Sequence, residues 1–399
     1  MDARPLSGNH WLEPLLPVFP SEILQLAEQV PFQAGKLSAM VAPQMIRRVG
    51  ALLRVTSSFY SNLIEGQFTE PVTLAATAPK RHRKELAELA TTHIDTQQAF
   101  ERALTLHKDL PWEALFSPGF VGRIHQRLFQ GVNDDQLRLS DGSLLVPGEL
   151  RDVAGREVSV GNHAAPHSQS VTPMLARMQQ VYGRLPDARS RLLAVMAYHH
   201  RLAWVHPFVD GNGRTVRLVT HLQLHKLGLV SPLWSLSRGL ARQQETYYAR
   251  LANADQPRRG DLDGRGQLTQ AGLFEFVGFM LETCLDQMRY TEQALGVSNM
   301  RERLHTVFAW DEQIKRAGIK LESARAMHVL LTQGVLSRAD FKIFTGLSDR
   351  AATDQLKGLV QLGLVESATP KARDVYPGLP VWFAQLLFPN LHQRMVSAS

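Results

Sequence analysis

Hydrophobic residues recur three and four positions apart along most of the chain, which is the spacing of amphipathic helices. From about Pro43 this pattern continues to Gly66, where a glycine favours the end of a helix. Further helices are predicted at 80–106, 119–129, 171–182, 188–203 and 212–226. The first twenty residues contain four prolines and are predicted to lie as an extended arm on the surface. The pattern therefore predicts a mainly α-helical protein.

The segment 139–166 departs from this pattern because glycines and prolines interrupt it. It contains one short alternating run, which consists of Arg156, Glu157, Val158, Ser159 and Val160. Alternation between residues that break helices predicts an irregular loop with a small β-hairpin.

Toward the C-terminus the pattern changes again. A helix is predicted over 321–331. Ser337 is placed to cap a short helix that reaches Thr345, and Ser348 is placed to cap a longer one over 349–362. Two short strands with a charged tip follow, so this order predicts a winged helix-turn-helix.

Composition is ordinary for a soluble globular protein, with 399 residues, 44% hydrophobic content and a formal net charge of +7. This charge permits binding of nucleotides or nucleic acid without implying it. No stretch is long and apolar enough to cross a bilayer, and the N-terminus lacks the pattern of a secretory signal. The single cysteine, Cys284, excludes an internal disulfide and lies at helical spacing among apolar residues, which indicates a core position. A cytoplasmic protein without membrane contact is expected.

One segment near the middle of the chain combines residue types that suit a polyphosphate. Gly211 and Gly213 flank Asn212 directly before a predicted helix, where backbone N–H groups can converge on an anion. Arg214 and Arg217 follow in the first turn, on one face. Two cations oppose the helix dipole at this end, and a bound anion would compensate them.

His206 and Asp210 complete the chemistry of this segment. The Asp210 carboxylate supplies a hard oxygen ligand for Mg²⁺, which binds proteins through one or two carboxylates together with phosphates. The His206 imidazole can accept a proton near neutral pH. A base, a metal ligand, an anion-binding loop and two cations are the parts that nucleotidyl transfer requires.

The segment 206–217 also matches, at every specified position, the signature of the Fic family, His-Pro-Phe-x-Asp/Glu-Gly-Asn-Gly-Arg-x-x-Arg. The run 61–66, Ser-Asn-Leu-Ile-Glu-Gly, resembles the inhibitory motif Ser/Thr-x-x-x-Glu-Gly/Asn of the class with an N-terminal inhibitory helix. Residues 155–161 take the place of the family's target-docking flap, and the resemblance covers about 8–290. It implies three domains: an N-terminal helical region with the inhibitory helix (1–110), an all-helical Fic catalytic core (111–296) and the winged helix-turn-helix (297–399).

The resemblance implies an enzyme, a protein adenylyltransferase that moves AMP from ATP to a Ser, Thr or Tyr hydroxyl of a target protein. His206 would deprotonate that hydroxyl, and Asp210 would hold Mg²⁺ against the α- and β-phosphates. The remaining motif residues would bind phosphates: Asn212 with the backbone of Gly211 and Gly213 at the α-phosphate, Arg214 at the outer phosphates and Arg217 at the γ-phosphate.

The resemblance also implies autoinhibition. Glu65, in the motif that begins at Ser61, would pair with Arg217 and block productive seating of the γ-phosphate. The alternating run 156–160 would bind an extended target segment by strand addition, in which main-chain hydrogen bonds set the register.

Several alternatives remain open at the level of sequence. The enzyme could instead remove AMP from a modified protein, with Glu65 positioning the attacking water. The transferred group could be phosphate or UMP, although Gly213 matches the AMP-transferring pattern and the phosphate-transferring Doc branch has lysine there. The winged helix could bind DNA as a regulator or mediate a homodimer. DNA binding is the less favoured of the two, because acids balance bases in the expected recognition helix, which contains Asp349, Arg350, Asp354 and Lys357.

Three aromatic residues outside the motif also have a structural and a functional interpretation. His199 lies on an apolar helical face, which favours a buried structural histidine over a metal ligand. Tyr247 and Tyr248 are expected to pack in the protein and not to contact adenine.

Overall fold

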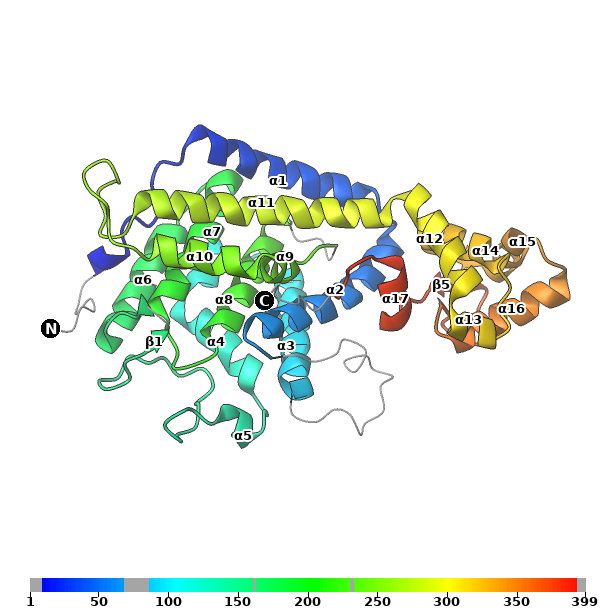
Figure 1. Ribbon diagram of the computed structural model, residues 1–399, viewed down its shortest axis with the longest axis horizontal. Helices are drawn as coiled ribbons and strands as arrows, with labels where there is room; N and C mark the ends of the chain where they lie inside the picture. Colours follow the sequence, from blue (N-terminus) through cyan, green and yellow to red (C-terminus); the bar gives the residue numbers. More distant parts are fainter. Residues whose placement is uncertain (1–8, 68–85, 161–162, 230–232, 393–399) are drawn as a thin grey trace.

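The computed structural model describes residues 9–67, 86–160, 163–229 and 233–392. It is mainly α-helical, as predicted (Figure 1). The helices of the larger part are α1 (Ser21–Ala39), α2 (Pro43–Ile64), α3 (Leu86–Leu106), α4 (Pro118–Phe129), α5 (Asp134–Leu137), α6 (Val171–Tyr182), α7 (Ala188–Val205), α8 (Asn212–Lys226), α9 (Leu236–Arg242), α10 (Gln244–Ala254) and α11 (Gln270–Leu295). Short 3-10 helices lie at η1 (Asn9–Leu12), η4 (Trp112–Phe116) and η5 (Ser168–Ser170).

Helices α7 and α8 form the centre of this part. Almost every residue of α8 from Asn212 to Leu224 is buried, and α8 contacts α2, α3, α4 and α7. The long helix α11 covers α7 and runs side by side with α1 (Figure 1). A helix that is buried on all sides must satisfy its polar groups inside the protein. The buried α8 therefore carries Arg214 and Arg217 into the interior, where they can meet α2.

The predicted helices are confirmed where the structure describes them. The range 119–129 is α4, 171–182 is α6, 212–226 is α8, and the helix predicted at 188–203 continues to Val205 as α7. Residues 80–85 of the helix predicted at 80–106 lie outside the described residues. Within the described ranges, no helix has the length and apolar character that a membrane crossing requires.

The prediction of an exposed arm at the N-terminus is wrong for the described residues. Leu12, Leu15 and Phe19 are buried. Helix α1 follows directly and escapes the sequence pattern because Pro31, which has no N–H to donate, lies inside it. Its buried residues recur at helical spacing, and they are Ile23, Ala27, Val30, Ala34 and Leu37. The packing of this stripe along α11 outweighs the local effect of the proline.

The predicted hairpin is present but shorter than expected. Strands β1 (Ser159–Val160) and β2 (His163–Ala164) pair antiparallel. The expected strand over 156–160 is thus wrong in its first three positions. The side chains of Arg156 and Glu157 form ion pairs with loop residues of the protein, and the Val158 carbonyl accepts a hydrogen bond from the Ala165 N–H at 3.2 Å next to the short ladder.

The C-terminal unit lies at one end of the molecule, where α12 follows α11 (Figure 1). Its helices are α12 (Val297–Trp310), α13 (Glu312–Arg316), α14 (Ser323–Gln333), α15 (Arg338–Thr345), α16 (Asp349–Gln361) and α17 (Val381–Leu387). Its strands are β3 (Leu336–Ser337), β4 (Val365–Glu366) and β5 (Asp374–Pro377), in the antiparallel order β3-β5-β4. The Ser337 hydroxyl caps α15 as predicted, since it accepts a hydrogen bond from the Asp340 N–H.

The cap predicted at Ser348 is wrong, because its side chain makes no capping hydrogen bond. Asp349 places a negative charge in the first turn of α16 instead, where it complements the helix dipole. Asp349 also forms an ion pair with Lys342 of α15. Helix α16 therefore begins at the predicted residue but is stabilised there by a different side chain.

The C-terminal unit returns to contact α2. Glu366 of β4 forms an ion pair with Arg48 of α2. After α17 the chain reaches the middle of α2, where His392 Nε2 lies 2.9 Å from the Thr56 hydroxyl. The boundaries expected at 110 and 296 stay predictions.

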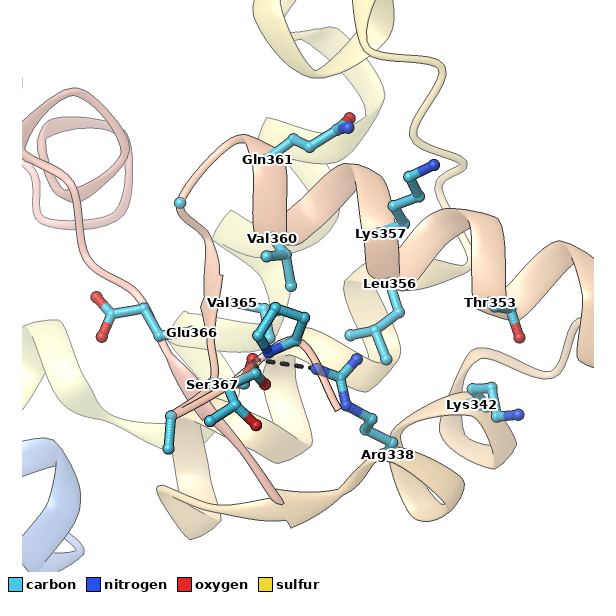
Figure 2. Close-up of a pocket in the computed structure, with 14 residues that line it drawn as sticks. Arg338, Lys342, Thr353, Leu356, Lys357, Val360, Gln361, Val365, Glu366 and Ser367 are labelled. Carbon is cyan, nitrogen blue, oxygen red and sulfur yellow. Dashed lines mark hydrogen bonds between the residues drawn. The ribbon is translucent and has the colours of Figure 1, made fainter. Parts of the chain in front are cut away.

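A groove of about 730 Å³ lies between α16 and the turn that joins β4 to β5 (Figure 2). Its apolar lining includes Leu356, Val360 and Val365. Arg338 crosses the groove and donates hydrogen bonds to the Ala372 carbonyl and the Ser367 hydroxyl, at 2.7 and 3.0 Å. Lys342 at its edge is paired with Asp349. Two cations of this groove thus already have partners within the protein.

Candidate active site

A tight loop joins α7 to α8 and carries the predicted chemistry. It begins at His206, the C-cap of α7, and ends at Gly211, the N-cap of α8. Both adopt the left-handed conformation, with φ of 50° at His206 and 77° at Gly211. This conformation costs a residue with a side chain about 1–2 kcal/mol, so the surrounding structure must hold His206 in place.

Asn212 fixes the shape of this loop. Its Oδ1 accepts a hydrogen bond from the Phe208 N–H at 2.9 Å, and its Nδ2 donates to the Phe208 carbonyl at 2.8 Å. The side chain is buried, with 4% of its residue surface exposed. The carboxamide predicted to touch the α-phosphate is therefore occupied by the loop itself. Only the backbone N–H of Asn212 is left to point along the helix N-terminus.

The glycines on either side of Asn212 lie against other side chains. A Cβ at Gly211 would lie 2.3 Å from Phe129 Cζ, and one at Gly213 would lie 2.2 Å from Glu65 Oε1. At Gly211 the neighbour is a buried aromatic ring, whereas at Gly213 it is the tip of the flexible Glu65 side chain. The Glu65 carboxylate thus covers the first turn of α8.

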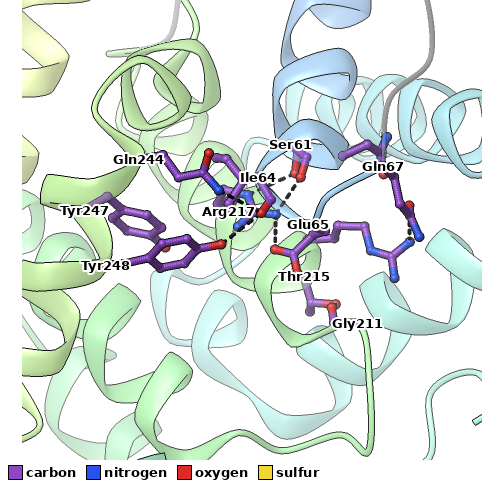
Figure 3. A network of polar contacts seen from close by, with 12 residues as sticks. Ser61, Ile64, Glu65, Gln67, Gly211, Thr215, Arg217, Gln244, Tyr247 and Tyr248 are labelled. Atoms are coloured by element: carbon purple, nitrogen blue, oxygen red, sulfur yellow. Dashed lines mark hydrogen bonds and ion pairs between the residues drawn. The ribbon is translucent and has the colours of Figure 1, made fainter. Parts of the chain in front are cut away.

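Figure 3 shows Glu65 and Ser61 converging on Arg217. The Arg217 Nε donates to the Ser61 hydroxyl at 3.0 Å, and its Nη2 donates to the Ser61 carbonyl and to Glu65 Oε1, both at 2.7 Å. Arg217 is 2% exposed. Burial acts to lower the pKa of Arg217, but the Glu65 carboxylate together with Tyr247 and Tyr248 outweighs burial, and the pKa is raised. The structure thus brings Ser61, Glu65 and Arg217 together as one polar cluster, in which Ser61 and Arg217 are buried and the Glu65 side chain is 31% exposed.

Helix α10 holds the end of α2 that carries Glu65 (Figure 3). The Tyr248 hydroxyl and the Gln244 amide both donate to the Ile64 carbonyl, at 2.9 and 3.2 Å. Such bonds satisfy carbonyls that a helix leaves without partners at its C-terminus. Tyr247 beside them is buried and packs as predicted. Tyr248 is partly exposed. The sequence analysis did not predict its hydrogen bond to α2.

Arg214 differs from Arg217 because part of its guanidinium has no partner. It is 5% exposed and lies over the Phe129 ring, 4.6 Å from the centroid. Its Nη1 makes a long contact of 3.4 Å to Gln67. Its buried Nε has no hydrogen-bond partner among the described residues. A buried, unsatisfied cationic donor fits an anionic ligand at this position.

Asp210 and His206 lie on the same loop. The Asp210 Oδ1 accepts a hydrogen bond from the Gly211 N–H at 2.6 Å, and Asp210 is exposed. No group of three or more His, Cys, Asp and Glu residues in the described part of the chain is arranged to hold a metal ion. A single carboxylate nevertheless suits Mg²⁺ that is held mainly by phosphates. The pKa of His206 is lowered to about 4, first by burial and then by the charge of Arg151, so the imidazole is neutral at pH 7.

The family of the central segment follows from comparison with known proteins. Residues 115–224 match the model of the Fic/DOC family. The chain contains a Fic/DOC family domain. A Fic family protein from Desulfovibrio desulfuricans G20, whose structure is solved, aligns with 91% of this chain and 98% of its own. Its sequence identity is 20% and the TM-score is 0.53, which shows a shared fold.

Two further solved structures align with the Fic/DOC part and its surroundings. A Fic domain-containing signaling protein from Bacteroides thetaiotaomicron VPI-5482 covers 68% of this chain and 96% of its own, at 15% identity and a TM-score of 0.48. Fic-1 from C. elegans covers 69% and 73%, at 16% identity and a TM-score of 0.47. These alignments are weaker, and no inference rests on them.

The Fic/DOC match includes the loop and α8 but not α2. His206, Asp210, Arg214 and Arg217 lie within the matched range, whereas Glu65 precedes it. The cluster of Ser61, Glu65 and Arg217 is therefore built between the Fic/DOC domain and a helix that comes before it in the chain. The inhibitory role of that helix stays a prediction.

His125 of α4 supports the Fic/DOC loop and was missed by the sequence analysis. Its Nδ1 accepts from the Gly148 N–H at 2.8 Å, so its Nε2 carries the hydrogen and donates to the Asp210 carbonyl at 3.0 Å. Its ring stacks on Phe208, 3.8 Å between centroids. Burial is the main cause that lowers the pKa of His125 to about 4, which keeps this tautomer neutral. No sequence signal links a histidine on α4 to this loop.

The flap side chains are turned toward the protein. Arg156 forms a 2.7 Å ion pair with Glu149. The Ser168 N–H donates one bifurcated hydrogen bond to both carboxylate oxygens of Glu157, each at 3.2 Å, and Glu157 lies 3.8 Å from Arg151. The side chains at 156 and 157 are therefore engaged within the domain, and strand addition of a target to this segment stays a prediction. Nothing is described for the expected flap residue at 161.

The prediction that His199 is a buried structural histidine is confirmed. Its two ring nitrogens lie 2.8 Å from the Thr220 and Tyr247 hydroxyls, and its side chain is fully buried. Burial holds its pKa well below the usual value. Cys284 is also buried, as predicted for a core position.

Proposed function

We propose that this protein is a protein adenylyltransferase that moves AMP from ATP to a hydroxyl of a target protein. The observation that carries the proposal is the first turn of α8. There the Arg214 guanidinium, whose Nε has no partner among the described residues, and the backbone of Gly213 directly follow the loop that carries a neutral imidazole. A Fic/DOC domain is known for the transfer of nucleotide-derived groups to proteins, and the signature with Gly213 favours AMP among these groups.

The transfer step assigns one role to each group of this loop. His206 takes the proton from the target hydroxyl as its oxygen attacks the α-phosphorus of ATP. The bond between the α-phosphorus and the oxygen bridging to the β-phosphate breaks, and pyrophosphate leaves. Backbone N–H groups at the start of α8 and Arg214 stabilise the charge on the phosphates. Mg²⁺, held by Asp210 and the phosphates, would neutralise the pyrophosphate that leaves.

The resting protein is autoinhibited in this proposal. Arg217 is already paired with Ser61 and Glu65, and the Glu65 carboxylate covers Gly213. A γ-phosphate that approached Arg217 would meet this carboxylate at close range, and two anions repel each other most strongly where water is excluded. Release of Glu65 would free both the cation and the helix terminus.

A second candidate is removal of AMP from a modified protein. The observation in its favour is the position of Glu65, whose charge acts on His206 as well as on Arg217. A carboxylate at this point could orient water for attack on a phosphodiester. Incubation of an AMP-modified target with wild type and Glu65→Gly separates the two directions, since only removal requires Glu65.

The position of the label decides the reaction type. Glu65→Gly protein is incubated with Mg²⁺ and ATP labelled at either the α- or the γ-phosphate, alone and with a cell lysate. We expect protein-bound label from the α-position only, and none with Glu65→Gly/His206→Ala. Label from the γ-position alone would instead identify a kinase and contradict the proposal.

A further inference from the structure

Arg151 lies in the irregular loop before the flap and contacts the base of the proposed reaction. Its Nε donates to the His206 carbonyl at 2.6 Å, and its Nη2 donates to the carbonyls of Val205 and Pro166, both at 2.9 Å. Its backbone N–H donates to the Pro207 carbonyl at 2.9 Å. One residue thus binds three consecutive carbonyls, at 205, 206 and 207. Its side chain is completely buried.

These hydrogen bonds stabilise the turn in two ways. The last carbonyls of a helix have no partners within the helix, and a cation at that end also complements the helix dipole. His206 is a non-glycine residue in the left-handed conformation, which other contacts must hold. A guanidinium presents several donors in a rigid plane, so Arg151 can satisfy Val205 and His206 together.

The flap meets the same guanidinium from the other side. Glu157 Oε2 lies 3.8 Å from Arg151 Nη1. His163 of β2 places its Nε2 2.9 Å from the Trp204 carbonyl, in the last turn of α7. The segment expected to dock the target is therefore tied at two points to the end of the helix that carries His206.

We propose that Arg151 is a positioning residue, which fixes the orientation of the His206 imidazole by binding the carbonyls on both sides of it. The proposal rests on the function proposed above, because it assigns His206 the role of base. Arg151 does not touch the reacting atoms. It acts through the backbone of the loop, and its charge acts on the imidazole as well.

The charged groups around His206 give Arg151 a second, measurable effect. Arg151 and His163 lower the pKa of His206, whereas Glu65 raises it. Replacement of Arg151 by a neutral residue should therefore raise the pKa of His206 toward its ordinary value of 6.5. A role in folding alone would not produce this shift.

The test compares two Arg151 variants with a matched control in full-length Glu65→Gly protein. Arg151→Gln removes the charge, and Arg151→Lys keeps the charge but not the planar donors. Arg201→Gln is the control, because Arg201 on α7 is also fully buried but donates to Pro14 and not to the loop. We expect kcat to fall about 10- to 100-fold in both Arg151 variants, with KM for ATP nearly unchanged. We expect Arg201→Gln to lower Tm without this change in kcat.

The titration of the His206 imidazole, followed by NMR without ATP, tests Arg151 independently of transfer. We expect its pKa to rise in Arg151→Gln and to stay low in Arg151→Lys and Arg201→Gln. An unchanged titration in Arg151→Gln, or an unchanged kcat in Arg151→Lys should the first variant not fold, would overturn the proposal. If the Glu65→Gly parent transferred no AMP, the proposed function would fail, while this titration would still decide the electrostatic role of Arg151.

Discussion

Cationic side chains are grouped at the start of α8 and in the C-terminal groove, and the two regions differ in the partners of those side chains. At the start of α8, Arg214 and Arg217 are buried, and one donor of Arg214 has no partner among the described residues. In the C-terminal groove, Arg338 and Lys342 are only partly buried and are bonded within the unit (Figure 2). The first arrangement is prepared for an anion that the protein does not supply. In the second, Arg338 is hydrogen-bonded to neutral groups of the protein and Lys342 is paired with Asp349.

The larger hollow and the groups suited to catalysis lie in different regions of the protein. The groove has a well-defined hollow of about 730 Å³ but no buried, unsatisfied cationic donor among the residues described for it. The α8 site has such a donor and a neutral base fixed by buried contacts. Electrostatic stabilisation of a transition state depends on groups that are oriented beforehand and shielded from water. The comparison therefore supports α8, and not the C-terminal groove, as the site of the proposed reaction.

The largest effect is expected from loss of the base. His206→Ala in Glu65→Gly protein should lower AMP transfer about 10²- to 10⁴-fold, the range typical of general base catalysis. ATP binding, measured by calorimetry, should change little because His206 is not one of the phosphate ligands. His305→Ala, at an exposed position of α12, is the control. Full activity of His206→Ala would contradict the proposal that the α8 site contains the base of the reaction.

Release of the inhibitory contact comes next. Glu65→Gly should increase transfer about 5- to 150-fold, which corresponds to a coupling free energy of about 1–3 kcal/mol. The physical reason is that Arg217 loses its carboxylate partner and becomes available to a phosphate. Initial rates with α-labelled ATP measure this change. A rate no higher than that of wild type would show that the Glu65–Arg217 pair is structural only.

The pH dependence of the same rate is a smaller but sharper test. A base acts in its neutral form, and the pKa of His206 is lowered to about 4. The rate of Glu65→Gly protein should therefore stay level from pH 8 to about pH 5 and fall only below that. If His206 had the ordinary histidine pKa of 6.5, half of the transfer rate would already be lost at pH 6.5. A midpoint near 6.5 would mean that the imidazole is neither buried nor influenced by Arg151 as described.

Buried histidines should make the protein lose stability on acidification at a higher pH than paired carboxylates would, because the ordinary pKa of histidine is higher than that of a carboxyl group. Burial lowers the pKa of His93, His125 and His392 to about 3, 4 and 3 in the folded protein. The unfolded chain then binds more protons below about pH 6.5, so the free energy of unfolding falls as the pH drops through this range. Urea unfolding at pH 7 and pH 5 measures the loss. Equal stability at both values would contradict the buried, neutral state of these residues.

The smallest effect is expected where the C-terminal unit meets α2. Arg48 and Glu366 form an ion pair with 37% and 43% of their side chains exposed. Exposed pairs contribute about 0–1 kcal/mol, so Glu366→Arg should change stability and basal transfer only slightly. The charge swap Arg48→Glu/Glu366→Arg should restore whatever is lost. An increase in transfer as large as that of Glu65→Gly would show that the C-terminal unit controls the inhibitory helix, which would break the comparison.

The sequence was most informative where the chemistry requires neighbouring residues. His206, Asp210, Arg214 and Arg217 are close along the chain, so their types and spacing predict a nucleotide site directly. Glu65 lies far from these residues in sequence, and it could be assigned to the site because it belongs to the short motif at 61–66. Helices α2, α4, α6, α7 and α8 also follow from spacing, whereas α1, whose packing against α11 outweighs Pro31, was not predicted.

The residues that hold the site could not be predicted in this way. His125 and Arg151 reach the loop from segments far from it in sequence, and each acts by hydrogen bonds to main-chain carbonyls. A carbonyl is present at every residue, so nothing in the sequence marks which one will be bound. Asn212 was expected to meet a phosphate, whereas its carboxamide binds the backbone of Phe208. Only the three-dimensional arrangement distinguishes these roles.

The central claim is that the start of α8 binds a triphosphate next to His206. A crystal structure of Glu65→Gly protein with Mg²⁺ and a non-hydrolysable ATP analogue tests it most directly. The account predicts phosphate density against the backbone of Gly213, with Arg214 Nε bonded to a phosphate oxygen and Arg217 turned to the γ-phosphate. An analogue bound elsewhere, with Arg214 and Arg217 unchanged, would contradict it.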